Sequence, residues 1–498
     1  MYKPTIGLEI HVELKTKTKM FCDCLNDPDE KEPNLNICPI CMGHPGTMPV
    51  INREAVRKVI KTGLAMNCQI PYFSKFDRKN YFYPDLPKGY QISQYDKPFC
   101  QNGSLEIMGK KIGITRIHLE EDTGRLIHPE KADYSLVDFN RAGIPLMELV
   151  TEPDLKSAQE AKKFAEEFKL ILKYLDVSDV NMEKGQMRVE VNISLSKNPN
   201  KLGTKVEIKN LNSFRVVEKS IEYEIKRQAQ ILKSGKKIVQ ETRGWDSIKE
   251  ITKSQREKES AHDYRYFPEP DLAPIKWKQK DIDKMKAELP ELPEQRRERF
   301  KKEYEVLDKE VAEVSPHLPP RSTLQNSAIE IFVSNKNLGE YFEKVISELE
   351  PNLSHKELLK LIKLTANYLI TDLQGLLGGL SVEDKKFLIS PENFAELIAL
   401  IHKNTISSKI AKTILPEMFK TGADPSNIIQ EKGLTQMTDQ SDVEKAVEQV
   451  IAQNQKAVSD LKNGKQGALQ FLIGQVMAQT KGKASPEIAT KILKKLLS

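Results

Sequence analysis

A strict alternation of apolar and polar residues near the start of the chain predicts a β-strand over residues 6–14. Its apolar positions are Ile6, Leu8, Ile10, Val12 and Leu14, and its polar positions are Glu9, His11 and Glu13. Successive strand side chains face opposite sides of a sheet, so the two carboxylates and the imidazole share one face, about 6 to 7 Å apart. A slip by one residue would bury the charges, so the apolar face sets the register. The polar face can hold a divalent cation if neighbouring strands add oxygen ligands.

Strand and helix patterns alternate over residues 1–290. Strands are predicted at residues 6–14, 112–119, 188–195 and 205–211, and helices at residues 52–66, 157–175 and 213–234. Two prolines and a charge run at residues 290–297 mark a boundary, beyond which helical periodicity dominates. A second break is expected near residues 404–408, followed by small helices such as 443–453 and 465–480. The pattern predicts an α+β protein with a β-rich domain at 1–290, an all-α helical domain at 291–405 and a small α-helical tail domain at 406–498.

The composition is that of a globular protein, with 498 residues, 39% of them hydrophobic and 30% charged. No apolar stretch approaches the length of a membrane span, and no signal-peptide core precedes the polar residues 15–19. We therefore expect a cytoplasmic protein with no membrane partner and with reduced thiols.

Positive charge is concentrated at the C-terminal end. The net charge is +6, and the segment from Leu461 onward has seven lysines and one acidic residue, Glu487, which also sums to +6. A basic segment on a near-neutral body suggests a nucleic-acid partner, since phosphate contacts dominate such affinities. A solvated Lys-rich helix is an equally good interpretation from composition alone.

Four of the six cysteines form two close pairs, Cys22 with Cys24 and Cys38 with Cys41, separated by thirteen residues. Paired cysteines on two tight turns are typical of a tetrahedral thiolate site for structural Zn²⁺. The alternatives are buried thiols without metal, or disulfides, which a reducing compartment disfavours. The isolated Cys68 and Cys100 are expected to be packing residues.

Acidic residues also gather where other predicted strands end. Glu120, Glu121 and Asp122 are consecutive, and adjacent carboxylates repel one another unless a cation neutralises them. Glu148 lies in a third apolar strand that leads to Glu152 and a helix. Oxygen ligands with one imidazole suit Mg²⁺ or Mn²⁺, and Mg²⁺ typically binds phosphates.

Residues 188–195 and 205–211 are predicted to form a hairpin around a turn at 198–203. Its polar face mixes charges, including Glu190, Glu207 and Lys209. For the hairpin alone, an ordinary solvated sheet face is the better interpretation.

The chain has no P-loop, no dinucleotide-binding fingerprint and no kinase motif set, so any nucleotide site is of another type. Residues 75–91 mix basic and aromatic side chains between prolines. Such a loop can bind phosphates and stack a base, although a structural loop is also possible.

These motifs together resemble the B subunits of the tRNA-dependent aspartyl/glutamyl amidotransferases. The resemblance covers essentially the whole chain and rests on the segments 6–14 (IGLEIHVEL), 75–85 (KFDRKNYFYPD), 90–94, 118–124 (HLEEDTG), 134–141, 207–214 and 263–271 (DYRYFPEPD). Residues 471–477, followed by Lys481 and Lys483, resemble the tRNA-binding tail of that family. The archaeal paralogue, the E subunit, carries a large insertion in this region, for which the chain has no room, so the B subunit is favoured.

The resemblance implies a cradle-shaped catalytic domain and a two-step reaction. ATP phosphorylates the side-chain carboxylate of Glu-tRNA(Gln) or Asp-tRNA(Asn), and ammonia then displaces phosphate to form the amide. The A subunit, a glutaminase of the amidase type, supplies ammonia from glutamine, and the C subunit clamps the other two together. The chain has no Gly/Ser-rich amidase signature, which agrees with an external source of ammonia.

The resemblance also implies roles for single residues. The implied Mg²⁺ ligands are Glu9, His11, Glu121 and Glu148, with Glu120 and Glu152 as near alternatives. Lys79 and Lys88 are implied to lie near the ammonia path and the reacting groups, and the implied ATP-binding residues are Arg78, Asn80, Tyr81, Glu190 and Glu207. The zinc at Cys22, Cys24, Cys38 and Cys41 is implied to be structural, because only some members of the family carry these cysteines.

Two other functions are weighed against this one. A non-catalytic tRNA-binding module would prefer a basic face to carboxylates beside an imidazole. A synthetase-like ligase would carry a synthetase nucleotide signature, and the chain has none.

Overall fold

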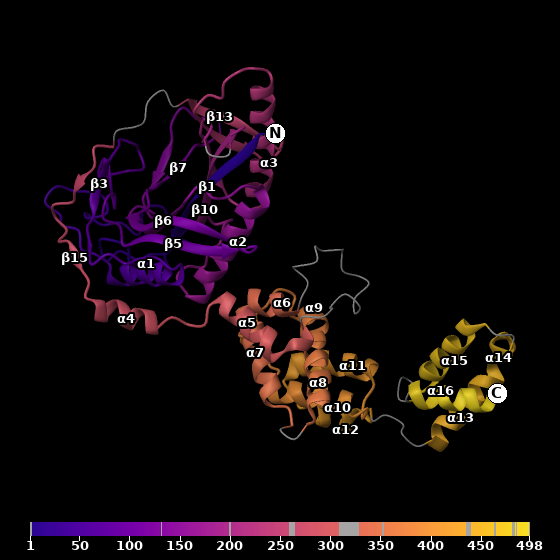
Figure 1. Cartoon of the computed structure of the whole chain (residues 1–498). Coiled ribbons are helices and arrows are strands. Elements are labelled where there is room, and N and C mark those ends of the chain that lie inside the picture. Colours follow the sequence, from indigo (N-terminus) through magenta and orange to yellow (C-terminus); the bar gives the residue numbers. More distant parts are fainter. Residues whose placement is uncertain are drawn as a thin grey trace. The chain divides into compact units, whose positions relative to one another are not determined.

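The computed structural model describes residues 2–130, 132–198, 201–257, 264–307, 328–350, 353–434, 440–462, 465–480, 484 and 486–497. The chain forms two compact units, Met1–Leu292 and Pro293–Ser498, and Figure 1 shows strands and helices in the first and helices in the second. The first boundary therefore lies beside the predicted one at residues 290/291. Asp263, the first residue of the segment 263–271, and residues 481–483, which contain Lys481 and Lys483, lie outside the described residues.

An eight-stranded sheet forms the centre of the first unit, in the order β13-β12-β11-β10-β1-β9-β6-β5. Its strands are β1 (Lys3–Glu13), β5 (Cys100–Ile107), β6 (Lys110–Glu121), β9 (Pro145–Thr151), β10 (Met187–Ser196), β11 (Val206–Leu211), β12 (Glu241–Asp246) and β13 (Ile251–Glu257). Neighbours pair antiparallel except β11 and β12, which are parallel. The predicted first strand thus has a central place, and β10 and β11 form the predicted hairpin.

Three helices pack on this sheet, namely α1 (Arg53–Ala65), α2 (Ala158–Tyr174) and α3 (Phe214–Lys233). Asn52, Ser157 and Ser213 cap their N-termini by accepting bonds from backbone N–H groups of the first turn. The apolar side chains of β1, such as Ile6, are fully buried in a core shared with these helices. The predicted period-2 face and all three predicted helices are confirmed.

Short strands complete the first unit. A three-stranded sheet joins β14 (Phe267–Pro268), β3 (Asp77–Asn80) and β4 (Tyr90–Ser93). Two further pairs are β2 (Phe73–Ser74) with β15 (Ile275–Lys276), and β7 (Arg125–Ile127) with β8 (Leu136–Asp138). Helix α4 (Gln279–Ala287) ends the unit. Pairing of β14 with β3 brings residues 264–267 beside the strand that carries Lys79.

The described residues of the second unit are helical and contain no named strand, as predicted. The helices are α5 (Pro293–Glu303), η1 (Glu305–Leu307), α6 (Ala328–Ser334), α7 (Lys336–Ser347), α8 (His355–Tyr368), η2 (Leu369–Leu373), α9 (Gln374–Leu377), α10 (Pro391–His402), α11 (Ser408–Thr421), α12 (Pro425–Lys432), α13 (Gln440–Gln453), α14 (Gln455–Lys462), α15 (Gln466–Gln479) and α16 (Pro486–Leu497). The last four share a core of their own that includes Val447, Leu472 and Leu493. The division proposed at 405/406 falls between α10 and α11, which contact each other, and it stays a prediction. Within the described part of the chain, no helix combines the length and apolar composition that a membrane span requires.

Candidate active site

A row of four polar residues crosses the central sheet. Strand register places Arg188 of β10 opposite His11 of β1, His11 opposite Glu148 of β9, and Glu148 opposite His118 of β6. Residues directly opposite each other on antiparallel strands project from the same face. Both imidazoles meet one carboxylate oxygen, because Glu148 Oε2 lies 3.3 Å from His11 Nε2 and 3.4 Å from His118 Nε2.

Glu9 and Glu120 extend this row on the same face, and together with Arg188, His11, Glu148 and His118 they form the carboxylate row. Glu9 Oε1 lies 3.8 Å from His11 Nε2, and Glu120 Oε2 lies 3.7 Å from His118 Nε2. Three groups have ligand atoms that lie within 4.8 Å of one another, namely Glu9–His11–Glu148, His118–Glu120–Glu148 and Glu9–Glu190–Glu207. The first two groups combine oxygen donors with one imidazole and the third has carboxylates alone, and both kinds of donor set suit Mg²⁺ or Mn²⁺.

The ionisation of these groups reflects their crowding. Burial, followed by the nearby Glu148 carboxylate, raises the pKa of Glu9 to about 7. Burial lowers the pKa of His11, but the hydrogen bond and charge of Glu148 outweigh it and raise the pKa to about 9. The pKa of Glu148 falls well below its usual range, because His118 and His11 outweigh the effect of its burial. Without a bound cation, protons on neighbouring groups therefore compensate the negative charge of Glu148. A divalent cation can take the place of these protons.

Glu121 does not join this cluster, contrary to the ligand set implied by the resemblance. Alternation along β6 places Glu120 on the face of His118 and directs Glu121 to the other face. Lys88 Nζ lies 2.5 and 2.6 Å from the two Glu121 oxygens, and the backbone N–H of Ile92 donates to Glu121 Oε1 at 2.9 Å. Glu120, the near alternative, takes the expected place, and Ser93 Oγ donates to its Oε2 at 2.9 Å. Glu152, the other alternative, accepts instead from Thr115 Oγ1 at 2.7 Å.

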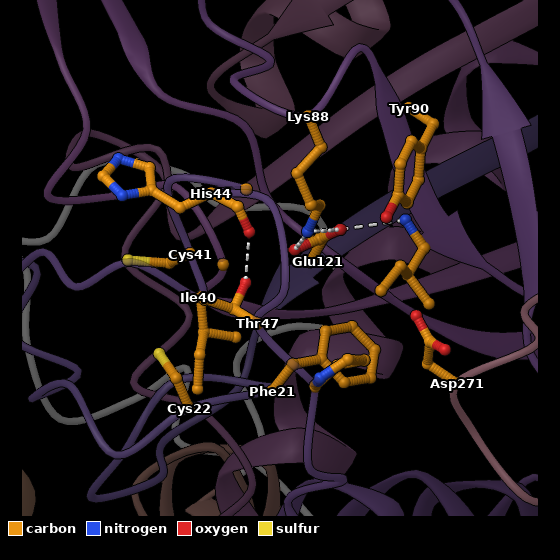
Figure 2. Close-up of a pocket in the computed structure, with 14 residues that line it drawn as sticks. Phe21, Cys22, Ile40, Cys41, His44, Thr47, Lys88, Tyr90, Glu121 and Asp271 are labelled. Atoms are coloured by element: carbon orange, nitrogen blue, oxygen red, sulfur yellow. Dashed lines mark hydrogen bonds and ion pairs between the residues drawn. The ribbon is translucent and has the colours of Figure 1, made fainter.

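Lys88 and Glu121 border a separate small cavity of about 60 Å³ (Figure 2). Its other walls include Phe21, Cys41 and Ile92. Lys88 therefore lies apart from the carboxylate row, in a cavity that Cys22 and Cys41 also line.

A cavity of about 1310 Å³ opens above the carboxylate row, and Glu9, His118 and Glu148 line it. Its basic and aromatic lining includes Lys79, Arg116, Lys205, Lys209, Tyr81, Phe82, Tyr264 and Tyr266. Cations attract phosphate groups and aromatic rings stack on bases, so the walls suit a nucleotide or the end of a nucleic acid.

The residues implied to bind ATP divide between this cavity and other places. Asn80, Tyr81 and Glu207 line the cavity, whereas Arg78 forms an ion pair with Glu269 at 2.7 Å and lies over the Tyr90 ring. Lys79 Nζ lies 5.2 Å from the centre of the Tyr264 ring. Burial lowers the pKa of Lys79, but Glu120 and Glu148 outweigh it and raise the pKa, so this lysine stays charged.

The polar face of the hairpin is not the solvated surface that its pattern favoured. Glu190 and Glu207 are each only 7% exposed. Lys209 Nζ lies 3.0 Å from Glu190 and 3.3 Å from Glu207. The interpretation as a solvated face is therefore wrong, because side chains on the same face, such as Lys209 and Glu9, pack against these carboxylates.

The four paired cysteines converge as predicted, with sulfur atoms within 4.8 Å of one another. All six cysteines are free thiols, and Cys68 and Cys100 are buried in the main core. A hydrogen bond with Cys22, and then the charge of Lys19, lower the pKa of Cys41 to about 5. Four converging sulfur donors fit the tetrahedral geometry of a structural Zn²⁺ site.

Known proteins are similar to this chain over its whole length. Residues 4–283 match the GatB/GatE catalytic domain and residues 340–497 match the GatB domain. Proteins named as the B subunit of aspartyl/glutamyl-tRNA(Asn/Gln) amidotransferase are similar over 100% of this chain and 99% of their own length. The identities are 47% in Caldicellulosiruptor saccharolyticus, 46% in Thermoanaerobacter pseudethanolicus and 45% in Thermotoga maritima. The chain belongs to the GatB family.

Family membership confirms the resemblance that the motifs indicated. The catalytic domain of the GatB family corresponds to the first unit, which contains the carboxylate row and the large cavity. Sequence reasoning did not assign a role to His118, Arg116, Tyr264 or Tyr266. His118 was detectable, because the alternation in β6 places it on the same face as Glu120. Tyr264 and Tyr266 reach the cavity only through the pairing of β14 with β3, which no local pattern reveals.

Proposed function

We propose that this chain is the component of an aspartyl/glutamyl-tRNA amidotransferase that carries out the amide-forming chemistry. It would phosphorylate the side-chain carboxylate of Glu-tRNA(Gln) or Asp-tRNA(Asn) with ATP and amidate it with ammonia. The observation that carries the proposal is the cluster of Glu9, His11, Glu148 and Glu120, of which Glu9 and Glu148 line a cavity with cationic and aromatic walls. The names of the similar proteins supply the substrate class.

The chemistry needs two transfers. A carboxylate is a poor electrophile, so one of its oxygens first takes the γ-phosphoryl group of ATP and ADP leaves. Ammonia then attacks the carbonyl carbon of the acyl phosphate, the C–N bond forms, the C–O bond to phosphate breaks and nitrogen loses a proton. A magnesium ion held by Glu9, His11 and Glu148, with Glu120 nearby, would neutralise the charge on the phosphoryl oxygens.

The remaining side chains of the cavity have roles that follow from their charge and position. Lys79, Arg116 and Lys209 present fixed positive charges toward the space where phosphates would lie. Tyr81 and Tyr264 offer ring faces for a base or ribose.

Partners follow from the same proposal. The A subunit, a glutaminase, would supply ammonia, and the C subunit would join it to this chain, in a heterotrimer that acts in the cytoplasm, where aminoacyl-tRNA is made. Lys88 and Glu121 would border the ammonia path. Ammonia would then enter from the face opposite the carboxylate row. The Lys-rich residues from Leu461 onward would bind tRNA phosphates. Zinc at Cys22, Cys24, Cys38 and Cys41 would be structural.

The test is a transamidation assay of the reconstituted heterotrimer with both misacylated tRNAs, with and without ATP. We expect ATP-dependent amide formation, and a loss of phosphorylation of about 100-fold or more in Glu148→Gln. The exposed Glu106 of β5 provides a matched control, since Glu106→Gln should leave the rate unchanged. Amidation without ATP, or normal phosphorylation in Glu148→Gln, would contradict the proposal.

A further inference from the structure

Two of the metal-binding groups described above share Glu148, and each offers one imidazole. One contains His11 with Glu9, and the other contains His118 with Glu120. The distances alone do not distinguish them, because both Nε2 atoms lie at a similar distance from the same Glu148 oxygen. The hydrogen bonds of the two rings do distinguish them.

Arg116 determines which nitrogen of His118 carries the proton. Arg116 Nε donates to His118 Nδ1 at 3.3 Å. A guanidinium has only donors and stays protonated in proteins, so His118 Nδ1 has to be the acceptor. An imidazole that accepts at Nδ1 carries its proton on Nε2.

The proton on Nε2 of His118 faces two acceptors. Glu148 Oε2 lies 3.4 Å away and Glu120 Oε2 lies 3.7 Å away, and all three side chains are buried. A histidine binds a metal through an unprotonated nitrogen. His118 can therefore become a ligand only by giving up its bond from Arg116.

His11 has a different environment. Arg188 is the residue opposite His11 on β10, but its Nη2 donates to the carboxylate of Asp122 at 3.2 and 3.3 Å. Arg188 is thus engaged with a carboxylate, whereas Arg116 donates directly to a ring nitrogen. Because Arg188 does not donate to His11 Nδ1, a cation between Glu9 and Glu148 can displace the proton of His11 Nε2 and leave the ring protonated at Nδ1.

We propose that Arg116 and His118 are positioning residues. Arg116 holds His118 in the tautomer with the proton on Nε2, and His118 donates through this proton to Glu148 and Glu120. The cation is then bound by His11 and not by His118. The part that concerns the cation rests on the proposed function. Groups that orient metal ligands in this way typically change metal affinity by about 10 to 100-fold when they are removed. Arg116 also places Nη2 3.7 Å from Glu148 Oε1, so one arginine supports the shared carboxylate both directly and through His118.

The tautomer can be read directly in the unmodified full-length chain. Two-bond ¹H–¹⁵N correlation spectra of protein labelled with ¹⁵N-histidine distinguish protonation at Nε2 from protonation at Nδ1, and His118→Gln assigns the signals. We expect the proton on Nε2 and none on Nδ1, which accepts from Arg116, before and after addition of Mg²⁺. A ring protonated at Nδ1, a ring protonated at both nitrogens, or loss of the Nε2 proton on Mg²⁺ addition would each overturn the proposal.

Variants then test what the pair does for the cation site. Arg116→Ala should weaken Mn²⁺ binding by about 10-fold and mix the two tautomers of His118, with the melting temperature as a check on folding. Arg125 is an exposed arginine on β7, so Arg125→Ala is the matched control and should change neither quantity. Unchanged Mn²⁺ affinity in Arg116→Ala would refute the positioning role. Absence of Mn²⁺ binding in the wild-type chain would instead contradict the proposed function, while the tautomer would still decide the relation of Arg116 to His118.

Discussion

Glu148 and His11 meet across two neighbouring strands, with Glu148 Oε2 3.3 Å from His11 Nε2 at the centre of the eight-stranded sheet. Each also contacts a residue from another side, since Glu148 reaches His118 of β6 and His11 reaches Glu9 of its own strand. A carboxylate between two imidazoles keeps its negative charge despite burial, which is the state that a cation requires.

The first prediction concerns the proposed ligands. Glu9→Gln and His11→Ala should each lower ATP-dependent phosphorylation of misacylated tRNA by more than about 100-fold, because a direct ligand contributes more than the outer-shell groups that change affinity by about 10 to 100-fold. Binding of tRNA should stay nearly intact, since neither substitution removes a positive charge that phosphates need. The measurements are phosphoryl transfer from labelled ATP in the assembled complex and tRNA affinity. Normal phosphorylation in either variant would remove the basis for the ligand assignment.

The second prediction concerns the cysteine cluster. Purified protein should contain one zinc per chain, and Cys38→Ser should lose it together with local stability, because a structural zinc contributes folding free energy. Elemental analysis and protection of residues 19–44 from proteolysis measure the two effects. Cys68→Ala is the control, because Cys68 lies in the main core outside the cluster, and its zinc content should be normal. Wild-type protein without zinc would refute this assignment.

The third prediction concerns Gly43, which lies two residues after Cys41 and has φ +68°. A side chain there would clash with Cγ of Lys88, so Gly43→Ala should displace Lys88 from Glu121 in addition to straining the backbone. Gly46 has φ +84° and nothing within 4 Å of an added Cβ, so Gly46→Ala isolates the backbone effect. Gly46→Ala should lose about 1 to 2 kcal/mol of stability, and Gly43→Ala should lose more because of the added clash. Only Gly43→Ala should change the reactivity of the Lys88 amine toward an acylating reagent, and equal reactivity in the two variants would be the contrary result.

The fourth prediction concerns pH and the second unit. Glu343 of α7 accepts from Arg296 at 2.7 Å and from Arg299. Burial raises its pKa, but bonds from Arg299 and Arg296 outweigh burial and lower the pKa below its usual value. A depressed pKa stabilises the fold above the unfolded-state pKa, about 4.3, and this contribution is lost as pH falls through the lower folded-state pKa.

Glu343→Gln should therefore destabilise the unit at pH 7 by about 1 to 2 kcal/mol and flatten its loss of stability below pH 5. The measurement is denaturant unfolding between pH 7 and pH 3. Glu340 on the same helix is 3.9 Å from Lys336 and more exposed, so Glu340→Gln should have little effect. An unchanged pH profile in Glu343→Gln would contradict the assignment.

The fifth prediction concerns the C-terminal helices. Removal of residues 440–498 should weaken tRNA binding by about 10-fold or more and reduce its salt dependence, because lysines that contact phosphates are lost. The helices α13–α16 have a core of their own, so the other helices should stay folded. Filter binding at several salt concentrations measures the affinity, and glutaminase activity of the complex on free glutamine provides the control. Equal tRNA affinity in the truncated chain would contradict the role of the tail.

The local patterns of the sequence determined much of this protein. The period-2 alternation determined β1 and its two faces, and Asn52, Ser157 and Ser213 determined where three helices begin. Such features depend on residues a few positions apart, whose geometry is set by the backbone itself. The cysteine spacing belongs to the same class, since each pair lies on one tight turn.

The tertiary structure alone decided which side chains meet. The choice of Glu120 over Glu121 depends on which side chains of β6 share a face of the sheet with Glu148 of β9, and the burial of Glu190 and Glu207 depends on the side chains of neighbouring strands on their face. Tyr264 reaches the cavity only because β14 pairs with β3. Strand order and the meeting of distant segments arise from burial of the apolar faces as a whole, which no short window of sequence contains.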